Sequence, residues 1–144
     1  MNESHYLTKA KHFWNPEWCA GDLFMESANA HYFFFLICGW PTLFLSLDVY
    51  AWIGRVSCWL FLAISWQKLN RSFGVRDSVV LFSAILFGIL TDRFDMAGEW
   101  VIGGFEAKSI SYIFVLWSIS RLLEGDIFRC LVPAGFAIAF HAVI

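Results

Sequence analysis

Charged side chains cluster between residues 91 and 109, in the segment TDRFDMAGEWVIGGFEAKS. The flanking residues 78–91 and 109–120 carry no charge. Asp95 and Glu99 are four residues apart, so a helix would place their carboxylates on one face. Two carboxylates in that arrangement are typical of a divalent-cation site or of a general acid paired with a general base.

The same segment continues into a glycine pair and two further charges. Gly103-Gly104 would let the backbone turn sharply or approach a ligand closely. Glu106 and Lys108 follow at the start of an apolar stretch, where charge is costly and usually functional. The alternative is a solvated loop between two helices, but Val101 and its apolar neighbours are poor loop residues. We therefore expect the segment to fold back onto a membrane face and to form a site there.

The composition indicates what kind of protein must position these side chains. Hydrophobic residues make up 59% of the 144 residues and charged residues 15%. A soluble domain averages about 45–50% apolar and about 25% charged. The excess predicts a lipid-embedded protein, and the sixteen Phe and eight Trp agree with it, because Trp favours the headgroup level of a bilayer. The net charge of −2 and the lack of a basic face exclude nucleic acid as an expected partner.

The hydrophobic residues occur in long runs that follow a polar N-terminal segment, residues 1–26. Runs that are apolar on all sides predict helices, because membrane strands would alternate in polarity. We predict an all-α, polytopic transmembrane bundle of four to five hydrophobic helices over residues 27–144, with residues 1–26 as an interfacial segment. The apolar runs are residues 27–47, 49–67, 78–91, 109–123 and 127–144. The last run stays apolar to its final residue, so we also expect a piece of a longer polytopic protein.

The first apolar run and the loop charges leave two orientations open. Gly39 and Pro41 predict a kink or break within residues 27–47. The basic loop 68–77 belongs in the cytoplasm by the positive-inside rule, and the acidic loop 91–108 belongs outside. Residues 1–26 lie in the cytoplasm if every run crosses the membrane. They share the outer face with residues 91–108 if the run containing Pro41 dips in and returns.

Arg55 interrupts the second apolar run, seven residues after Asp48 and on the same helical face. One interpretation is an arginine that snorkels to the interface or pairs structurally with a carboxylate. The functional interpretation is a contact to an anionic headgroup or a phosphate. His5 and His12 are also seven residues apart and would share a face, which makes metal ligation an alternative to solvated histidines.

The N-terminal segment NESHYLTKAKHFW…CAGDLFMES resembles the first external loop of GT-C-type membrane glycosyltransferases. Those proteins carry an Asp-Glu pair followed by Tyr, Ala and Gly-Asp. The corresponding residues here are Asn2-Glu3, Tyr6, Ala10 and Gly21-Asp22. The stretch AWIGRVSCWLF resembles the start of a following family helix, which makes Arg55 the matching arginine. MAGEWVIGGFEAKSISY and the C-terminal AFH are similar to uncharacterised bacterial multipass proteins of this organisation.

The resemblance implies a chemistry. In that superfamily an acidic residue of the first external loop catalyses transfer from a polyprenyl-phosphate sugar, often with a divalent metal ion. The resemblance also favours an outer location for residues 1–26, in a multipass protein of the bacterial inner (cytoplasmic) membrane. Asn2 stands where the family has Asp, and an amide cannot act as a carboxylate base, so Glu3, Asp22 or Glu26 would have to substitute. The family enzymes have more than ten spans, so we expect the chain alone to be inactive.

The expected site residues fall into three groups. The catalytic candidates are Glu3, Asp22 and Glu106, the substrate-binding candidates are Arg55, Lys108 and Glu26, and the candidate ligands of a divalent metal ion are Asp95 and Glu99.

Two functions remain open. The first is the N-terminal part of a GT-C-like glycosyltransferase that takes a polyprenyl-phosphate sugar. The second is a small non-enzymatic membrane protein, such as an assembly partner or a transporter component. Its carboxylates would form structural or ion-conducting pairs, and its partners would be other membrane subunits beside the lipid bilayer.

Overall fold

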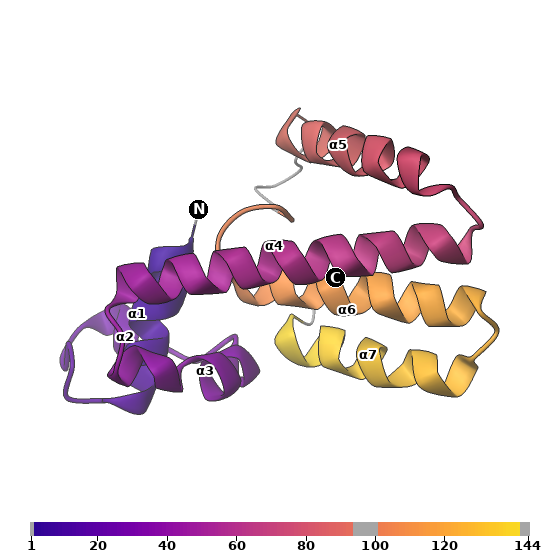
Figure 1. The fold of residues 1–144 in the computed structure, drawn as a ribbon. Helices are drawn as coiled ribbons and strands as arrows, with labels where there is room; N and C mark the ends of the chain where they lie inside the picture. Colours follow the sequence, from indigo (N-terminus) through magenta and orange to yellow (C-terminus); the bar gives the residue numbers. More distant parts are fainter. Residues whose placement is uncertain (1, 94–100, 142–144) are drawn as a thin grey trace.

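The computed structural model describes residues 2–93 and 101–141, and within them the chain is helical without a strand (Figure 1). The all-α prediction is confirmed. The elements are α1 (Glu3–Trp14), α2 (Leu23–Glu26), α3 (Tyr32–Cys38), the 3-10 helix η1 (Trp40–Leu43), α4 (Leu47–Ser72), α5 (Asp77–Arg93), α6 (Ala107–Leu123) and α7 (Ile127–Phe140).

The first apolar run does not form one continuous helix. It divides into α3, with seven residues, and η1, with four, and Gly39 separates the two. A helix of seven residues rises only about 10 Å, far less than a bilayer core of about 30 Å. Trp14 packs closely over the break, and its indole Nε1–H donates to the carbonyl of Phe35 at 2.9 Å. The expected break at Gly39 and Pro41 is confirmed as the point where α3 ends and η1 begins.

Each of the other four runs forms one helix. Among the described residues, α4 is the one helix that is both long enough and apolar enough to cross a membrane, with 26 residues. α5 and α7 are apolar but shorter, and α6 has 17 residues. Helices of 14 to 17 residues rise about 21 to 26 Å, which is short for a span that faces lipid on its own.

α6 occupies the middle of the helical layer, between α4 and α7 (Figure 1). The hydroxyl of Ser111 donates to the Ala137 carbonyl at 2.6 Å, and that of Ser118 donates to the Cys130 carbonyl at 3.1 Å. On the α4 side, the hydroxyls of Ser120 and Ser72 lie 3.0 Å apart. Small hydroxyl side chains let helix backbones approach closely, as they do within membranes.

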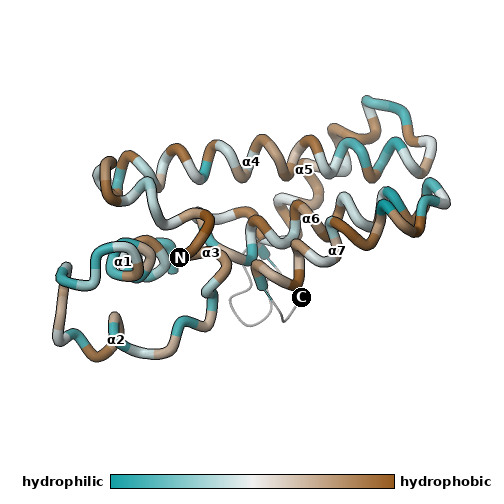
Figure 2. Tube along the Cα trace, turned by 90° about the horizontal axis from the view of Figure 1, so that it is seen from below, coloured by the Kyte–Doolittle hydropathy of each residue, from teal (hydrophilic) through white to brown (hydrophobic). Residues whose placement is uncertain are grey.

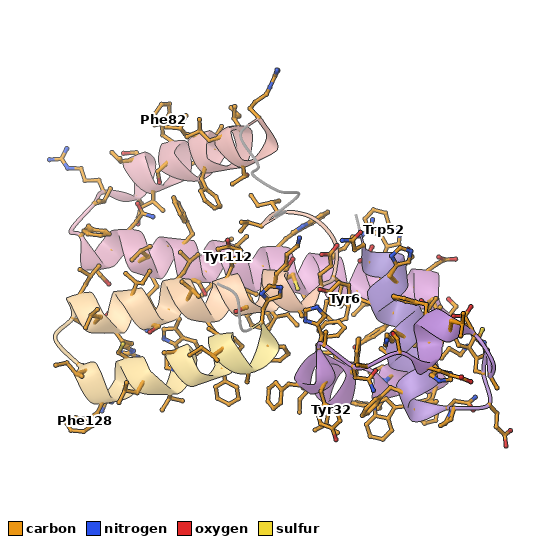
Figure 3. The ribbon with its side chains drawn as sticks, turned by 180° about the vertical axis from the view of Figure 1, so that it is seen from behind. Tyr6, Tyr32, Trp52, Phe82, Tyr112 and Phe128 are labelled. Atoms are coloured by element: carbon orange, nitrogen blue, oxygen red, sulfur yellow. The ribbon has the colours of Figure 1, made fainter. Side chains whose placement is uncertain are left out.

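The outer surface of the helices is apolar. Hydrophobic segments recur along α4 to α7 in Figure 2, and Phe82 and Phe128 point away from the helices in Figure 3. Phe82 is 67% exposed and Phe128 86% exposed. α5 buries Val80 alone among its large apolar side chains, and attaches to α4 by a stack of Trp66 on Phe87 at 4.6 Å. An apolar surface this extensive is unlike that of a soluble monomer.

The N-terminal helices pack at the end of α4 where that helix begins. The centre of this packing is the ring of Phe105, which lies 5.3 Å from the rings of both Phe34 and Tyr50. A Cβ added at Gly54 would lie 2.2 Å from the Phe105 ring, so α4 needs a glycine there for the contact. The core thus joins α3, α4 and the segment that precedes α6.

Candidate functional site

Glu3 connects three separate parts of the chain. It is the first residue of α1 and is 4% exposed. Its carboxylate accepts hydrogen bonds from Arg55 Nε, at 2.8 and 3.1 Å, and from Arg55 Nη2. The backbone N–H of Phe105 donates to Oε1 at 2.7 Å. A Cβ at Gly104 would lie 2.8 Å from the Glu3 Cβ, so glycine is needed for this approach.

Arg55 is therefore paired with a carboxylate, as the structural interpretation of its sequence position proposed. Its guanidinium also lies over the ring of Trp52 at 5.1 Å, an arrangement typical of a cation–π contact. The arginine side chain is 25% exposed, so one side of the buried pair still reaches the surface. The pair as a whole carries no net charge.

Glu106 and Lys108 form a second pair beside the first. Glu106 precedes α6 and is 1% exposed, and its Oε1 accepts the backbone N–H of Asn2 at 2.9 Å. Its Oε2 lies 3.8 Å from Lys108 Nζ and has no hydrogen-bond donor among the described residues. The start of α1 is thus held by two buried carboxylates, Glu3 and Glu106. The structure brings together four residues that the sequence singled out independently.

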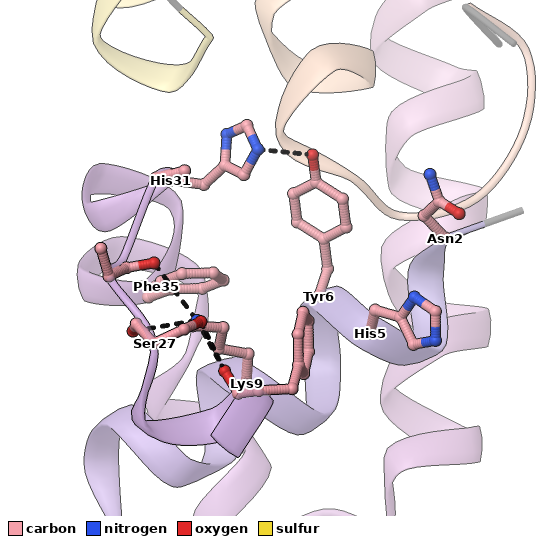
Figure 4. A pocket seen from close by; sticks show the side chains of 10 residues that line it. Asn2, His5, Tyr6, Lys9, Ser27, His31 and Phe35 are labelled. Carbon is pink, nitrogen blue, oxygen red and sulfur yellow. Dashed lines mark hydrogen bonds between the residues drawn. The ribbon is translucent and has the colours of Figure 1, made fainter. Parts of the chain in front are cut away.

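A pocket of about 330 Å³ lies between α1, the loop that follows α2, and α3 (Figure 4). Two of its lining side chains are hydrogen-bonded to each other, with the Tyr6 hydroxyl 2.9 Å from His31 Nε2. Lys9 Nζ donates to the carbonyl of Phe24 at 2.9 Å and to the Ser27 hydroxyl at 2.5 Å. The lining consists of Asn2, His5, Tyr6, Lys9, Phe24, Ser27, Ala28, Ala30, His31 and Phe35.

The surroundings of His31 favour its neutral form. Burial lowers the pKa of His31 below its usual value of 6.5, and the nearby His141 and Lys108 lower it further, against a smaller opposing effect of a hydrogen bond to the Phe140 backbone. The rings of His31 and His141 stack at 5.2 Å. Lys9 is buried as well, and burial lowers its pKa. Its hydrogen bonds go to neutral oxygens, so no described carboxylate cancels its charge beside the pocket.

The remaining sequence-predicted residues lie elsewhere. Asp22 caps α2 by accepting the backbone N–H groups of Phe24 and Met25 at 2.9 and 3.0 Å. Glu26 accepts the N–H of Gly21 at 2.7 Å. Both carboxylates are exposed on the loop and neither lines the pocket. Their catalytic and substrate-binding roles stay predictions.

The expected metal ligands, Asp95 and Glu99, lie outside the described residues. Within residues 2–93 and 101–141, no group of three His, Cys, Asp or Glu side chains is arranged to hold a metal ion. His12 Nδ1 contacts the Trp18 carbonyl at 2.8 Å, whereas the ring of His5 lies beside Phe24 in the pocket. His5 and His12 therefore lie in different surroundings and do not form the metal-binding pair that their spacing suggested.

The pocket as a unit was not predicted from the sequence. Asn2, His5, Tyr6 and Lys9 follow the spacing i, i+3, i+4 and i+7, which places polar side chains on one face of a helix. That stripe on α1 is the signal that would have identified the pocket. His31 comes from a distant segment and carries no such pattern.

Comparisons with known proteins identify no relative, because no family model, no curated protein and no solved structure matches this chain.

Replacing Arg55 by Met should destabilise the protein strongly, because it leaves the Glu3 carboxylate buried without a cation. Breaking a buried pair in this way costs about 3–5 kcal/mol of unfolding free energy. The matched control is Arg71→Met, which breaks the pair of Arg71 and Asp77, whose side chains are 58% and 71% exposed. An exposed pair contributes about 0–1 kcal/mol. Denaturant unfolding in detergent micelles measures both, and equal losses would contradict this assignment.

The lowered pKa of His31 predicts that acid weakens the fold. The unfolded state binds the proton at a higher pH than the folded state does, so stability falls as pH drops through about 6.5. His31→Phe, which cannot take a proton, should flatten this part of the melting-temperature profile. His12→Gln, on α1 but outside the pocket, should retain the wild-type decline. An unchanged decline in His31→Phe would show that another group is responsible.

Proposed function

We propose that the chain is a multipass protein of the bacterial cytoplasmic membrane, with α4 to α7 lying in the bilayer as four hydrophobic helices. The outward apolar side chains of α4, α5 and α7 support this proposal, because they have no protein partner in the described chain. The serine contacts between α6 and its neighbours support it too, since such contacts hold helices together where no hydrophobic effect does.

The orientation follows from the two ends of α4. The turn that joins α4 to α5 carries Arg71 and Arg76, and the positive-inside rule assigns it to the cytoplasm. The N-terminal helix α1 lies at the other end, where Glu3 meets Phe105 and Asn2 meets Glu106 (Figure 1). Because α3 and η1 are too short to cross, residues 1–26 share the outer face with residues 101–106 in this proposal.

We infer that the pocket binds the anionic head of a polyprenyl-phosphate sugar, in line with the resemblance to GT-C-type glycosyltransferases. The observation that carries this inference is the position of the 330 Å³ pocket, which is lined by His5, Lys9 and His31 among apolar side chains, at the end of an apolar bundle. A lipid-linked ligand would reach it from the bilayer, and the uncancelled charge of Lys9 would attract a phosphate. The volume is at the lower end of the range for small-molecule sites, about 300–1,000 Å³.

The chemistry of the pocket favours binding over transfer. No carboxylate belongs to its described lining, and Glu3 and Glu106 are held in the buried pairs beside it. Within this proposal Glu3 and Arg55 position α1, and Glu106, paired with Lys108, holds Asn2, the residue before α1. A lining group suited to take a proton from an acceptor hydroxyl is His31, whose lowered pKa favours the neutral ring and which is hydrogen-bonded to Tyr6.

The second candidate is a non-enzymatic membrane protein that assembles with other membrane subunits. The observation in its favour is that Glu3, Glu106, Asp22 and Glu26 all make contacts that order the chain itself. On this account the pocket is a packing gap, and the buried pairs serve only to fix α1 in place.

A binding assay separates the two candidates. A polyprenyl-phosphate hexose added to the detergent-purified chain should raise its melting temperature, since a ligand at 100 times its Kd adds about 2.7 kcal/mol. His5→Ala should weaken this stabilisation, because His5 lines the pocket and is exposed. His12→Ala, on the same helix outside the pocket, should leave the stabilisation unchanged.

Two controls define the ligand. The matching polyprenyl phosphate without hexose should stabilise the protein less, and the uncharged polyprenol should have no effect. Equal stabilisation by the polyprenol would show that only the tail is bound. No stabilisation by the hexose lipid, or equal losses in both histidine variants, would favour the non-enzymatic candidate.

A further inference from the structure

A second cavity lies at the opposite end of the bundle, in a groove between α6 and α7. It has a volume of about 320 Å³ and is unrelated to the N-terminal pocket. Its lining combines apolar and cationic side chains, namely Phe114, Trp117, Arg121, Arg129, Val132, Pro133 and Phe136.

The apolar wall of the groove is built from stacked rings. Phe114 stacks on Phe136 at 5.2 Å and on Trp117 at 6.5 Å, with interplanar angles of 22° and 10°. Val132 is 62% exposed, so the groove is open at its side. Pro133 lies inside α7 and also lines the groove, and it has no backbone N–H that could act as a hydrogen-bond donor there. Such a surface suits a hydrocarbon chain.

The cationic end of the groove takes one arginine from each helix. Arg121 pairs with Glu124 at 2.9 Å and Arg129 with Asp126 at 3.3 Å, each three residues away along the chain. The Arg129 side chain is 74% exposed, and exposed pairs of this kind are weak. A guanidinium has five N–H donors, so each arginine retains donors for a second anion.

A third cation comes from α4. Lys68 Nζ lies 5.3 Å from the centre of the ring of Trp117, which lines the groove. The turns α4–α5 and α6–α7 lie side by side, as the contact between Ser72 and Ser120 shows. Residues 68–77 and 121–129 together hold five basic side chains and three acidic ones. This end of the bundle is therefore positive, and the groove opens within it.

We propose that the groove binds one anionic phospholipid of the cytoplasmic leaflet. Its phosphate lies between Arg121 and Arg129, where guanidinium groups can bond phosphate oxygens in pairs. One acyl chain lies along Phe114, Val132 and Phe136. A basic cluster beside a bilayer attracts anionic lipid, and here the aromatic wall holds the tail as well as the head. The lipid would fasten α7 to α6 beside the contact between Ser118 and Cys130.

Native mass spectrometry of the detergent-purified full chain tests this site, with phosphatidylglycerol and phosphatidylcholine supplied at equal concentration. The double variant Arg121→Gln, Arg129→Gln should retain less phosphatidylglycerol, by on the order of tenfold, and unchanged phosphatidylcholine. The matched control Arg71→Gln, Arg76→Gln removes the same charge from the neighbouring turn. It should lower phosphatidylglycerol retention by less than about twofold.

A third variant separates the effect of the groove on lipid retention from the effect of positive charge. Val132→Trp fills the groove with an apolar side chain at an exposed position, and it should also reduce phosphatidylglycerol retention. Equal losses in the groove and control pairs, or full retention in Val132→Trp, would overturn the proposal. So would displacement of the lipid by inorganic phosphate, which would assign the arginines to a free anion. Helical circular dichroism confirms folding of each variant, and Val132→Trp decides the question where the arginine pair fails to fold.

Discussion

The buried contact between Glu3 and Arg55 is the constraint on which the rest of the structure depends. It joins the start of α1 to α4, and through the Phe105 N–H it includes the segment before α6. A buried carboxylate without its cation is strongly destabilising, whereas the intact pair adds little net stability over an apolar replacement. The contact therefore acts mainly by selecting one arrangement. Gly104 and Gly54 permit that arrangement by leaving room for Glu3 and for the Phe105 ring.

The selected arrangement gives the helical layer two chemically different ends. One end holds α1, the neutral ion pairs and a pocket of mixed polarity that Lys9 lines. The other end holds basic turns and an aromatic groove between α6 and α7. Between them the surface is apolar on most sides, so in the proposed membrane arrangement a ligand at either end would lie where lipid meets water. The two proposed ligands, a lipid-linked sugar and a phospholipid, both follow from this geometry, but they rest on different residues.

The sequence predicted those features of the structure that depend on residues close together in the chain. Long apolar runs must form helices in lipid, and Gly39 and Pro41 break one of them as expected. It also identified Arg55, because an isolated charge in an apolar run is costly and is usually kept for a purpose, whereas Glu3 was named through the family resemblance of residues 1–26. It could not identify them as partners, since they are 52 residues apart and only the turn of α3 and η1 brings them together. The contribution of His31 to the pocket depends on the same long-range packing.

The central claim is that α1 and residues 101–106 lie on one side of a membrane and the α4–α5 turn on the other. Single cysteines at position 29 and position 73 test it with a membrane-impermeant thiol reagent in intact cells, in a background where Cys19, Cys38, Cys58 and Cys130 are all replaced by Ser. Asn29 is exposed in the loop after α2, and Phe73 is 63% exposed at the end of α4. The account predicts labelling of position 29 in intact cells and of position 73 only after permeabilisation. Labelling of both positions from the same side would contradict it.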